Sequence, residues 1–173
     1  MKMNNTWLKY ILVFILVVLI QGLVVNNMEV HEFVNPMVYP LLILVLPFEL
    51  TVLTTLVISF LVGISVDAFS NTFGLHTSAT LVIGYFRPTI LRYIKPRDGY
   101  DPSLLPTIHD MGIFWFFSYA TLILLIHHLW FFTIEIFSFD SLILLLAKTF
   151  LSTIFSLVLL VLLQYLFYTR SKR

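Results

Sequence analysis

Long apolar runs separated by short polar segments repeat along the whole chain. A helix needs about 20 apolar residues to cross a hydrocarbon core that is roughly 30 Å thick. The longest run, 36–69, is interrupted only at residues 47–49. As one helix it would be about 50 Å long, whereas a turn at 47–49 divides it into two short spans. With that turn, the predicted spans are residues 7–25, 36–48, 50–69, 74–94, 111–132 and 140–168.

The distribution of positive charge favours six spans over five. With six spans, every Lys and Arg except Lys148 lies on or near the side that holds both termini. Cytoplasmic loops carry an excess of Lys and Arg, so this side is expected to be cytoplasmic. With five spans, the basic segment 95–97 and the basic C-terminus would move to the other side. The sequence therefore predicts six spans with both termini in the cytoplasm.

The composition excludes several classes of protein. Of the 173 residues, 60% are hydrophobic and only 11% are charged. Soluble domains have about 45–50% apolar and about 25% charged residues, so a soluble domain and a disordered chain are both excluded. The chain has no Cys, which excludes disulfides and thiolate metal sites. The expected fold class is an all-α polytopic membrane protein with residues 1–173 as one integral membrane domain.

Ionisable residues inside the predicted spans are the candidates for function, because a charge at the bilayer centre costs about 2.5–3.5 kcal/mol. Opposite the termini we expect a polar cluster in which Asp67 and Lys148 form a charge pair. At the other end, Glu49 is expected to pair with Arg87 or Arg92. Such residues either hold helices together, which we favour, or mark a pathway for a solute or a proton. The cluster opposite the termini comprises Asp67, His76, His127, His128 and Lys148.

Signatures of metal sites and of enzymes are missing from the sequence. The adjacent His127 and His128 point about 100° apart on a helix, so a shared metal ion is disfavoured. No Gly-x-Ser-x-Gly, His-Glu-x-x-His or glycine-rich phosphate loop occurs. The chain is therefore predicted to be no enzyme and to bind no metal or cofactor.

The segment between the third and fourth predicted spans is the most distinctive. Gly63 lets a neighbouring helix approach closely, and Asp67 lies one turn further on the same face. Residues 70–72 are Ser, Asn and Thr and form a short polar turn. Gly74 then permits a positive φ before the next helix. This pattern predicts a helical hairpin with a buried polar anchor.

Two local features are expected on the side of the termini. The segment 95–109 contains three prolines and is predicted to be ordered by docking against the ends of spans two to four. Residues 107–110, Thr-Ile-His-Asp, have the pattern of a capping box that starts the next helix.

The hairpin segment resembles the MreD family of bacterial rod-shape-determining membrane proteins. The family pattern is a Gly, an Asp four residues later, a small polar turn and a Gly seven residues after the Asp. The corresponding residues are Gly63, Asp67, Asn71 in the turn, and Gly74, with His76 next to them. Further segments look like the Bacteroidetes-type form of the family, and they are Arg87-Pro88, 95–98, 106–112, His127-His128 and 137–139.

This resemblance implies a fold, a location and partners. The implied fold has six helices and is similar to the substrate-binding subunits of energy-coupling-factor transporters. The implied role is that of a non-enzymatic scaffold in the bacterial inner membrane, which binds MreC and helps regulate peptidoglycan synthesis and cell shape. MreB, RodA and the elongation transpeptidase would join the larger complex, together with membrane lipid and without nucleic acid.

A second hypothesis is a small-solute-binding membrane subunit of a transporter, and an intramembrane enzyme is a third. A transporter subunit is expected to contain a roomy polar pocket between its helices. A scaffold is expected to be packed shut and to expose an apolar groove to a partner helix.

Overall fold

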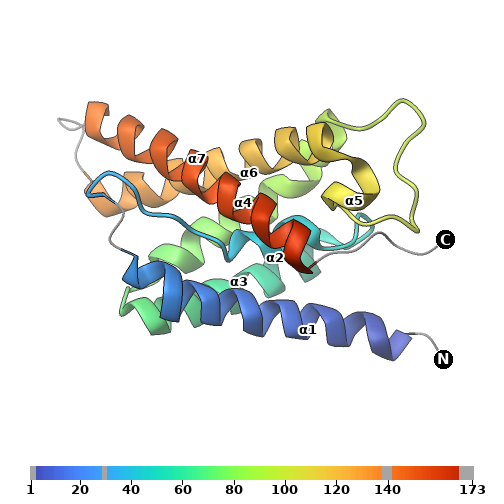
Figure 1. The fold of residues 1–173 in the computed structure, drawn as a ribbon, viewed down its shortest axis with the longest axis horizontal. Coiled ribbons are helices and arrows are strands. Elements are labelled where there is room, and N and C mark those ends of the chain that lie inside the picture. Colours follow the sequence, from blue (N-terminus) through green and yellow to red (C-terminus); the bar gives the residue numbers. More distant parts are fainter. Residues whose placement is uncertain (1–2, 29–30, 138–141, 168–173) are drawn as a thin grey trace.

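The computed structural model describes residues 3–28, 31–137 and 142–167, and regular structure in these ranges is helical (Figure 1). The first helix continues through a π-helical turn, η1 (Ile20–Val24), and a 3-10 turn, η2 (Val25–Asn27). The α-helices are α1 (Met3–Leu19), α2 (Pro40–Val45), α3 (Val52–Ser70), α4 (Leu75–Tyr93), α5 (Ile108–Met111), α6 (Ile113–Ile136) and α7 (Leu142–Phe167).

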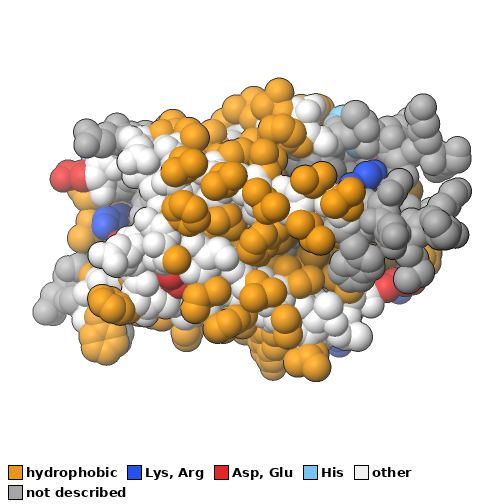
Figure 2. Space-filling model, turned by 90° about the horizontal axis from the view of Figure 1, so that it is seen from below, with side chains coloured by type: hydrophobic (Ala, Val, Ile, Leu, Met, Phe, Trp, Pro, Cys, Tyr) orange, Lys and Arg blue, Asp and Glu red, His pale blue; other side chains and the backbone are white. Residues whose placement is uncertain are grey.

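Four helical segments are long and apolar enough to cross a membrane: Leu8–Asn27, α3, α6 and α7. Large apolar side chains are exposed along all four, such as Leu12, Leu53, Phe117 and Ile154. Figure 2 shows such side chains covering the middle of one face, with Lys and Arg side chains toward its two ends. This arrangement confirms a helical multi-pass membrane protein.

Helix α4 is as long as α3 but more polar, because it lies inside the molecule. It packs between α3 and α6, and these neighbours cover much of it. Its buried side chains include His76, Thr80 and Arg87. A central helix of this kind tolerates polar residues, since protein groups replace the lipid around it.

The prediction of a helical span over residues 36–48 is wrong. Only α2 is helical there, and the residues before it are extended. Pro40 begins α2 at its first turn, and Leu46 is extended (ψ 146°) before Pro47, as the residue before a proline usually is. The whole segment 36–46 is nonetheless buried and runs between the helices from one end of the molecule to the other (Figure 1). Non-helical chain rises up to about 3.3 Å per residue and a helix about 1.5 Å, so about six residues of each kind cover roughly 29 Å, for which a continuous helix needs about 19 residues.

Side chains of distant helices satisfy the backbone of this extended crossing. The N–H of Asn35 donates to Ser152 Oγ (2.9 Å), and the N–H of Met37 donates to Ser156 Oγ (2.8 Å). The side chain of Gln21 accepts from the N–H of Val38 (2.7 Å) and donates to the carbonyl of residue 36 (3.3 Å). Irregular backbone survives at membrane depth only where protein partners replace water.

The two ends of the bundle differ. The start of α1, the end of α7 and the loop between α4 and α5 lie at one end, here named the terminal end (Figure 1). The α3–α4 and α6–α7 turns lie at the other, here named the turn end.

The loop at the terminal end docks as predicted. Tyr100 stacks on Phe48 with ring centroids 4.2 Å apart, and its hydroxyl donates to the carbonyl of Leu91 (2.8 Å). Burial raises the pKa of Tyr100 to about 12, so this hydroxyl keeps its proton. Trp115 packs beside the Tyr100 ring. The predicted helix start is also confirmed, because Thr107 caps α5 by accepting from the N–H of Asp110 (3.4 Å).

Candidate functional site

Three polar clusters inside the bundle contain five of the residues singled out from the sequence, namely Asp67, His76, Arg87, His127 and His128. The Asp67 cluster comprises Asp67, Thr72, His76 and Thr77, and it joins α3 to α4 at the turn end. The Tyr39 cluster comprises Tyr39, His76, His127, His128 and Ser156. The Arg87 cluster comprises Arg87, Tyr119 and the carbonyls of Leu46 and Pro47.

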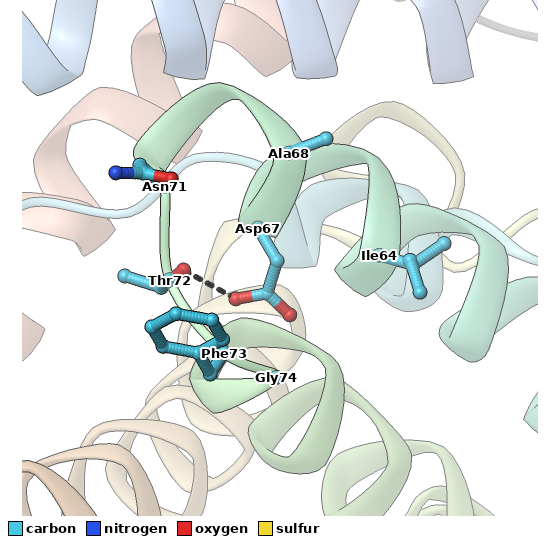
Figure 3. A pocket seen from close by; sticks show the side chains of 7 residues that line it. All are labelled: Ile64, Asp67, Ala68, Asn71, Thr72, Phe73 and Gly74. Atoms are coloured by element: carbon cyan, nitrogen blue, oxygen red, sulfur yellow. Dashed lines mark hydrogen bonds between the residues drawn. The ribbon is translucent and has the colours of Figure 1, made fainter.

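Asp67 is only 5% exposed and accepts four hydrogen bonds, of which Figure 3 shows the one from Thr72. One carboxylate oxygen accepts from the hydroxyl of Thr72 (2.5 Å) and the N–H of His76 (3.0 Å). The other accepts from the N–H (2.9 Å) and the hydroxyl (2.5 Å) of Thr77. The two N–H groups belong to the first turn of α4, which carries positive partial charge. Asp67 therefore caps α4 from the neighbouring helix α3.

The glycines around Asp67 have the roles that the sequence predicts. A Cβ on Gly63 would collide with the backbone of Thr77, so α3 and α4 touch at this point. The turn itself uses two left-handed residues, Asn71 (φ 54°) and Gly74 (φ 86°). The predicted helical hairpin with a buried polar anchor is confirmed.

The expected charge pair between Asp67 and Lys148 is wrong. Lys148 forms an ion pair with Glu135 across the α6–α7 turn (3.3 Å), and its ammonium lies 5.5 Å from the centre of the Phe132 ring. The negative charge of Asp67 is satisfied by N–H and hydroxyl donors. Backbone donors carry no formal charge, so matching charged residues along the sequence could not reveal them.

The Tyr39 cluster connects the extended crossing to α4, α6 and α7. The hydroxyl of Tyr39 lies 2.9 Å from His76 Nδ1 and 2.8 Å from His127 Nε2. His127 Nδ1 is buried without a partner among the described residues. An unpaired buried N–H is costly, so the proton of His127 belongs on Nε2 and is donated to Tyr39. Tyr39 in turn donates its own proton to His76.

His128 is fixed by a second chain of hydrogen bonds. Its Nδ1 lies 2.8 Å from the carbonyl of Leu124 and must donate, because a carbonyl only accepts. Its Nε2 is therefore the acceptor for the hydroxyl of Ser156 (3.2 Å), which itself accepts from the N–H of Met37. The two histidines therefore form hydrogen bonds with different partners.

Arg87 is 1% exposed and holds the turn that follows α2. Its Nε donates to the hydroxyl of Tyr119 (2.9 Å), and its terminal nitrogens donate to the carbonyls of Leu46 and Pro47. The guanidinium therefore binds the backbone just after α2, at carbonyls that belong to no helix. Pro88 follows within α4.

The predicted ion pair between Glu49 and an arginine is wrong. Arg87 does lie at the 47–49 turn, but it binds backbone carbonyls there. In the described part of the chain, no ion pair joins Glu49 to Arg87 or Arg92. Glu49 and Arg92 are both exposed at the terminal end.

The sequence reasoning missed the residues that hold the extended crossing. The residues missed are Tyr39, Tyr119 and Gln21. They are uncharged and isolated in the sequence, so a search for charged groups inside the spans does not find them. Helix α7 did carry a signal: Thr149, Ser152, Thr153 and Ser156 follow helical spacing on one face of an otherwise apolar span. Such a stripe indicates hydrogen bonding inside a membrane protein.

The buried polar side chains of the three clusters bind one another and backbone groups. Within the described residues, no group of three or more His, Cys, Asp or Glu side chains could hold a metal ion. Comparison with protein-family models, curated proteins and solved structures finds no match for this chain.

Proposed function

We propose that this protein is a scaffold subunit of the MreD type, without enzymatic activity, in the bacterial cell-elongation machinery. The observation that carries the proposal is the filled centre of the bundle. Residues 37–46 lie between the helices and are all buried, and every one of them except Pro40 is at most 2% exposed, with Pro40 buried as well. The position where a transporter subunit would hold its solute is occupied by the protein's own chain. A body packed in this way is suited to presenting its outer surface to partners.

The ordered hairpin of α3 and α4 also supports this proposal. Gly63, Asp67 and Gly74, which carry the resemblance to the MreD family, all act in this one turn. The proposed topology has six crossings, with the extended segment and α2 as the second. Lys9, Arg92, Lys95 and Arg97 are exposed toward the terminal end, which is therefore proposed to face the cytoplasm of a bacterial inner membrane.

The proposed partners are a single-span MreC-like protein and, through the larger complex, MreB, RodA and the elongation transpeptidase. Apolar side chains on α1, α3 and α7 offer broad surfaces for a partner helix. Association in a membrane depends on packing and interhelical hydrogen bonds, because lipid is as apolar as the helices. The partner is therefore expected to fit one face closely.

Depletion of the protein in its own bacterium tests the function. We expect rod-shaped cells to become round and the MreC-like protein to co-purify with the tagged chain. Photo-crosslinking residues placed at Leu12, Leu61 and Phe150 sample α1, α3 and α7 in turn. Crosslinks to the MreC-like protein from one face support the proposal. Unchanged cell shape together with no crosslink from any face would refute it.

Cysteine labelling tests the topology, and the natural chain offers a clean background because it has no Cys. Arg97 and Glu32 are both exposed and lie in loops before α5 and α2. Arg97→Cys is expected to be protected from a membrane-impermeant thiol reagent in intact cells, and Glu32→Cys is expected to label. Labelling of Arg97→Cys would reverse the proposed orientation. Lys172, which the sequence also predicts on the cytoplasmic side, lies outside the described residues.

A further inference from the structure

A surface cavity opens beside the Asp67 cluster at the turn end. Its volume is about 360 Å³, and Figure 3 shows the Asp67 carboxylate pointing toward it between Phe73 and Ile64. The Phe73 ring is fully exposed (104%) although it stands next to a buried carboxylate. The residues that line the cavity are Ile64, Asp67, Ala68, Asn71, Thr72, Phe73 and Gly74.

The cavity continues into an apolar ridge on the outer face of α3. Leu53, Val57, Leu61 and Ile64 follow one another at helical spacing and are each about half exposed or more. The ridge reaches the cavity at Ala68. From Ala68 back to Leu53 the helix measures about 22 Å, which exceeds half of a hydrocarbon core of roughly 30 Å. One acyl chain therefore fits along the ridge with its polar head at the cavity.

The negative charge at the cavity determines which kind of lipid headgroup can bind there. The Asp67 carboxylate accepts four hydrogen bonds, and this arrangement suits its ionised form. In the described part of the chain, no Lys or Arg forms an ion pair with it. A carboxylate with this many donors has little room to ligate a metal ion directly. It still attracts a cation by Coulomb force, more strongly near a low-dielectric interior than in water. The exposed face of Phe73 adds a cation–π contribution.

We propose that this cavity binds a phospholipid whose headgroup carries an ammonium group. The ammonium lies between the Phe73 ring and the Asp67 carboxylate, and the amide of Asn71, exposed at the rim, donates to the lipid phosphate. The acyl chain lies on Ile64 and the ridge below it. An anionic headgroup without an ammonium meets the negative charge of Asp67 with nothing to offset it. The inference concerns the lipid alone and holds for any protein partner.

Native mass spectrometry of the purified full chain tests the proposal. Phosphatidylethanolamine and phosphatidylglycerol of equal chain length are added in equal amounts, and the two lipid-bound species are compared. Phe73→Leu removes the aromatic face from a fully exposed position, where it cannot disturb the core. Ala68→Phe fills the cavity. The matched controls are Phe137→Leu, an 89% exposed aromatic at the end of α6, and Ile143→Phe, an 86% exposed position on α7 away from the cavity and the ridge.

The natural protein is expected to retain phosphatidylethanolamine over phosphatidylglycerol by about fivefold, as a cation–π contact of about 1 kcal/mol would give. Phe73→Leu and Ala68→Phe are expected to lose this preference, and both controls are expected to keep it. Equal retention of the two lipids by the natural protein would overturn the proposal. So would an unchanged preference in Phe73→Leu, which does not depend on whether Ala68→Phe folds.

Discussion

Asp67 offers the sharpest test of how the polar interior stabilises the protein. Asp67→Ala removes four hydrogen bonds, three to the start of α4 and one to Thr72 in the turn before it. Hydrogen bonds between membrane helices average about 0.6 kcal/mol each, and loss of a helix N-cap costs about 1 kcal/mol. The expected loss in the free energy of unfolding is therefore about 2–3 kcal/mol. Asp67→Asn keeps one acceptor oxygen and is expected to lose about half as much.

Double mutants distinguish the capping role from a charge pair. Lys148 contacts Glu135, so Lys148→Ala and Asp67→Ala are expected to be additive within about 0.5 kcal/mol. Thr77→Val removes a hydroxyl donor to Asp67, so its effect is expected to shrink strongly once Asp67 is already Ala. The assay is equilibrium unfolding in SDS-containing mixed micelles, followed by far-ultraviolet circular dichroism. Recovery of stability when Lys148→Ala is added to Asp67→Ala would refute the capping argument.

Three further substitutions probe the packing and the other two clusters by the same unfolding assay. Gly63→Ala places a methyl group against the backbone of α4 and is expected to cost about 1–3 kcal/mol, as overpacking usually does; an unchanged midpoint would show that the hairpin can separate freely. Arg87→Lys cannot reach a hydroxyl and two carbonyls together and is expected to destabilise by at least about 1 kcal/mol, while the exposed Arg92→Lys serves as a neutral control. Tyr39→Phe leaves two histidine nitrogens unpaired and is expected to cost about 1–3 kcal/mol, against almost nothing for Tyr85→Phe at a 61% exposed site; equal effects of the two would contradict the proposed hydrogen bonds.

The sequence was most informative where a pattern repeats or a backbone angle is special. Long apolar runs indicate the positions of the long helices, because an apolar run of that length is typical of a membrane-spanning helix. Gly63 and Gly74 located the close contact and the turn of the hairpin, because few other residues fit there. The docked loop before α5 was also predictable, since its prolines exclude a helix.

The sequence was least informative about which side chains contact one another in the folded protein. Asp67 and Lys148 were assigned similar depth, but depth does not specify the direction in which a side chain points around its helix. Lys148 instead uses Glu135, which faces it across a short turn. The extended crossing was missed for a different reason. Its apolar composition suits a helix and a buried strand equally, and only Pro40 and Pro47 indicate how short the helix is.

The hydrogen bonds of the extended crossing have a consequence for biogenesis. Two of its N–H groups depend on Ser152 and Ser156, which the ribosome delivers more than a hundred residues after Asn35 and Met37. Until α7 has been inserted, these groups need water, so the crossing cannot settle in lipid by itself. Packing of this segment between the helices is therefore completed only after the last helix has been inserted and closes over it. We expect a chain truncated before α7 to leave these two N–H groups without their partners, even though most of its apolar helices are already in place.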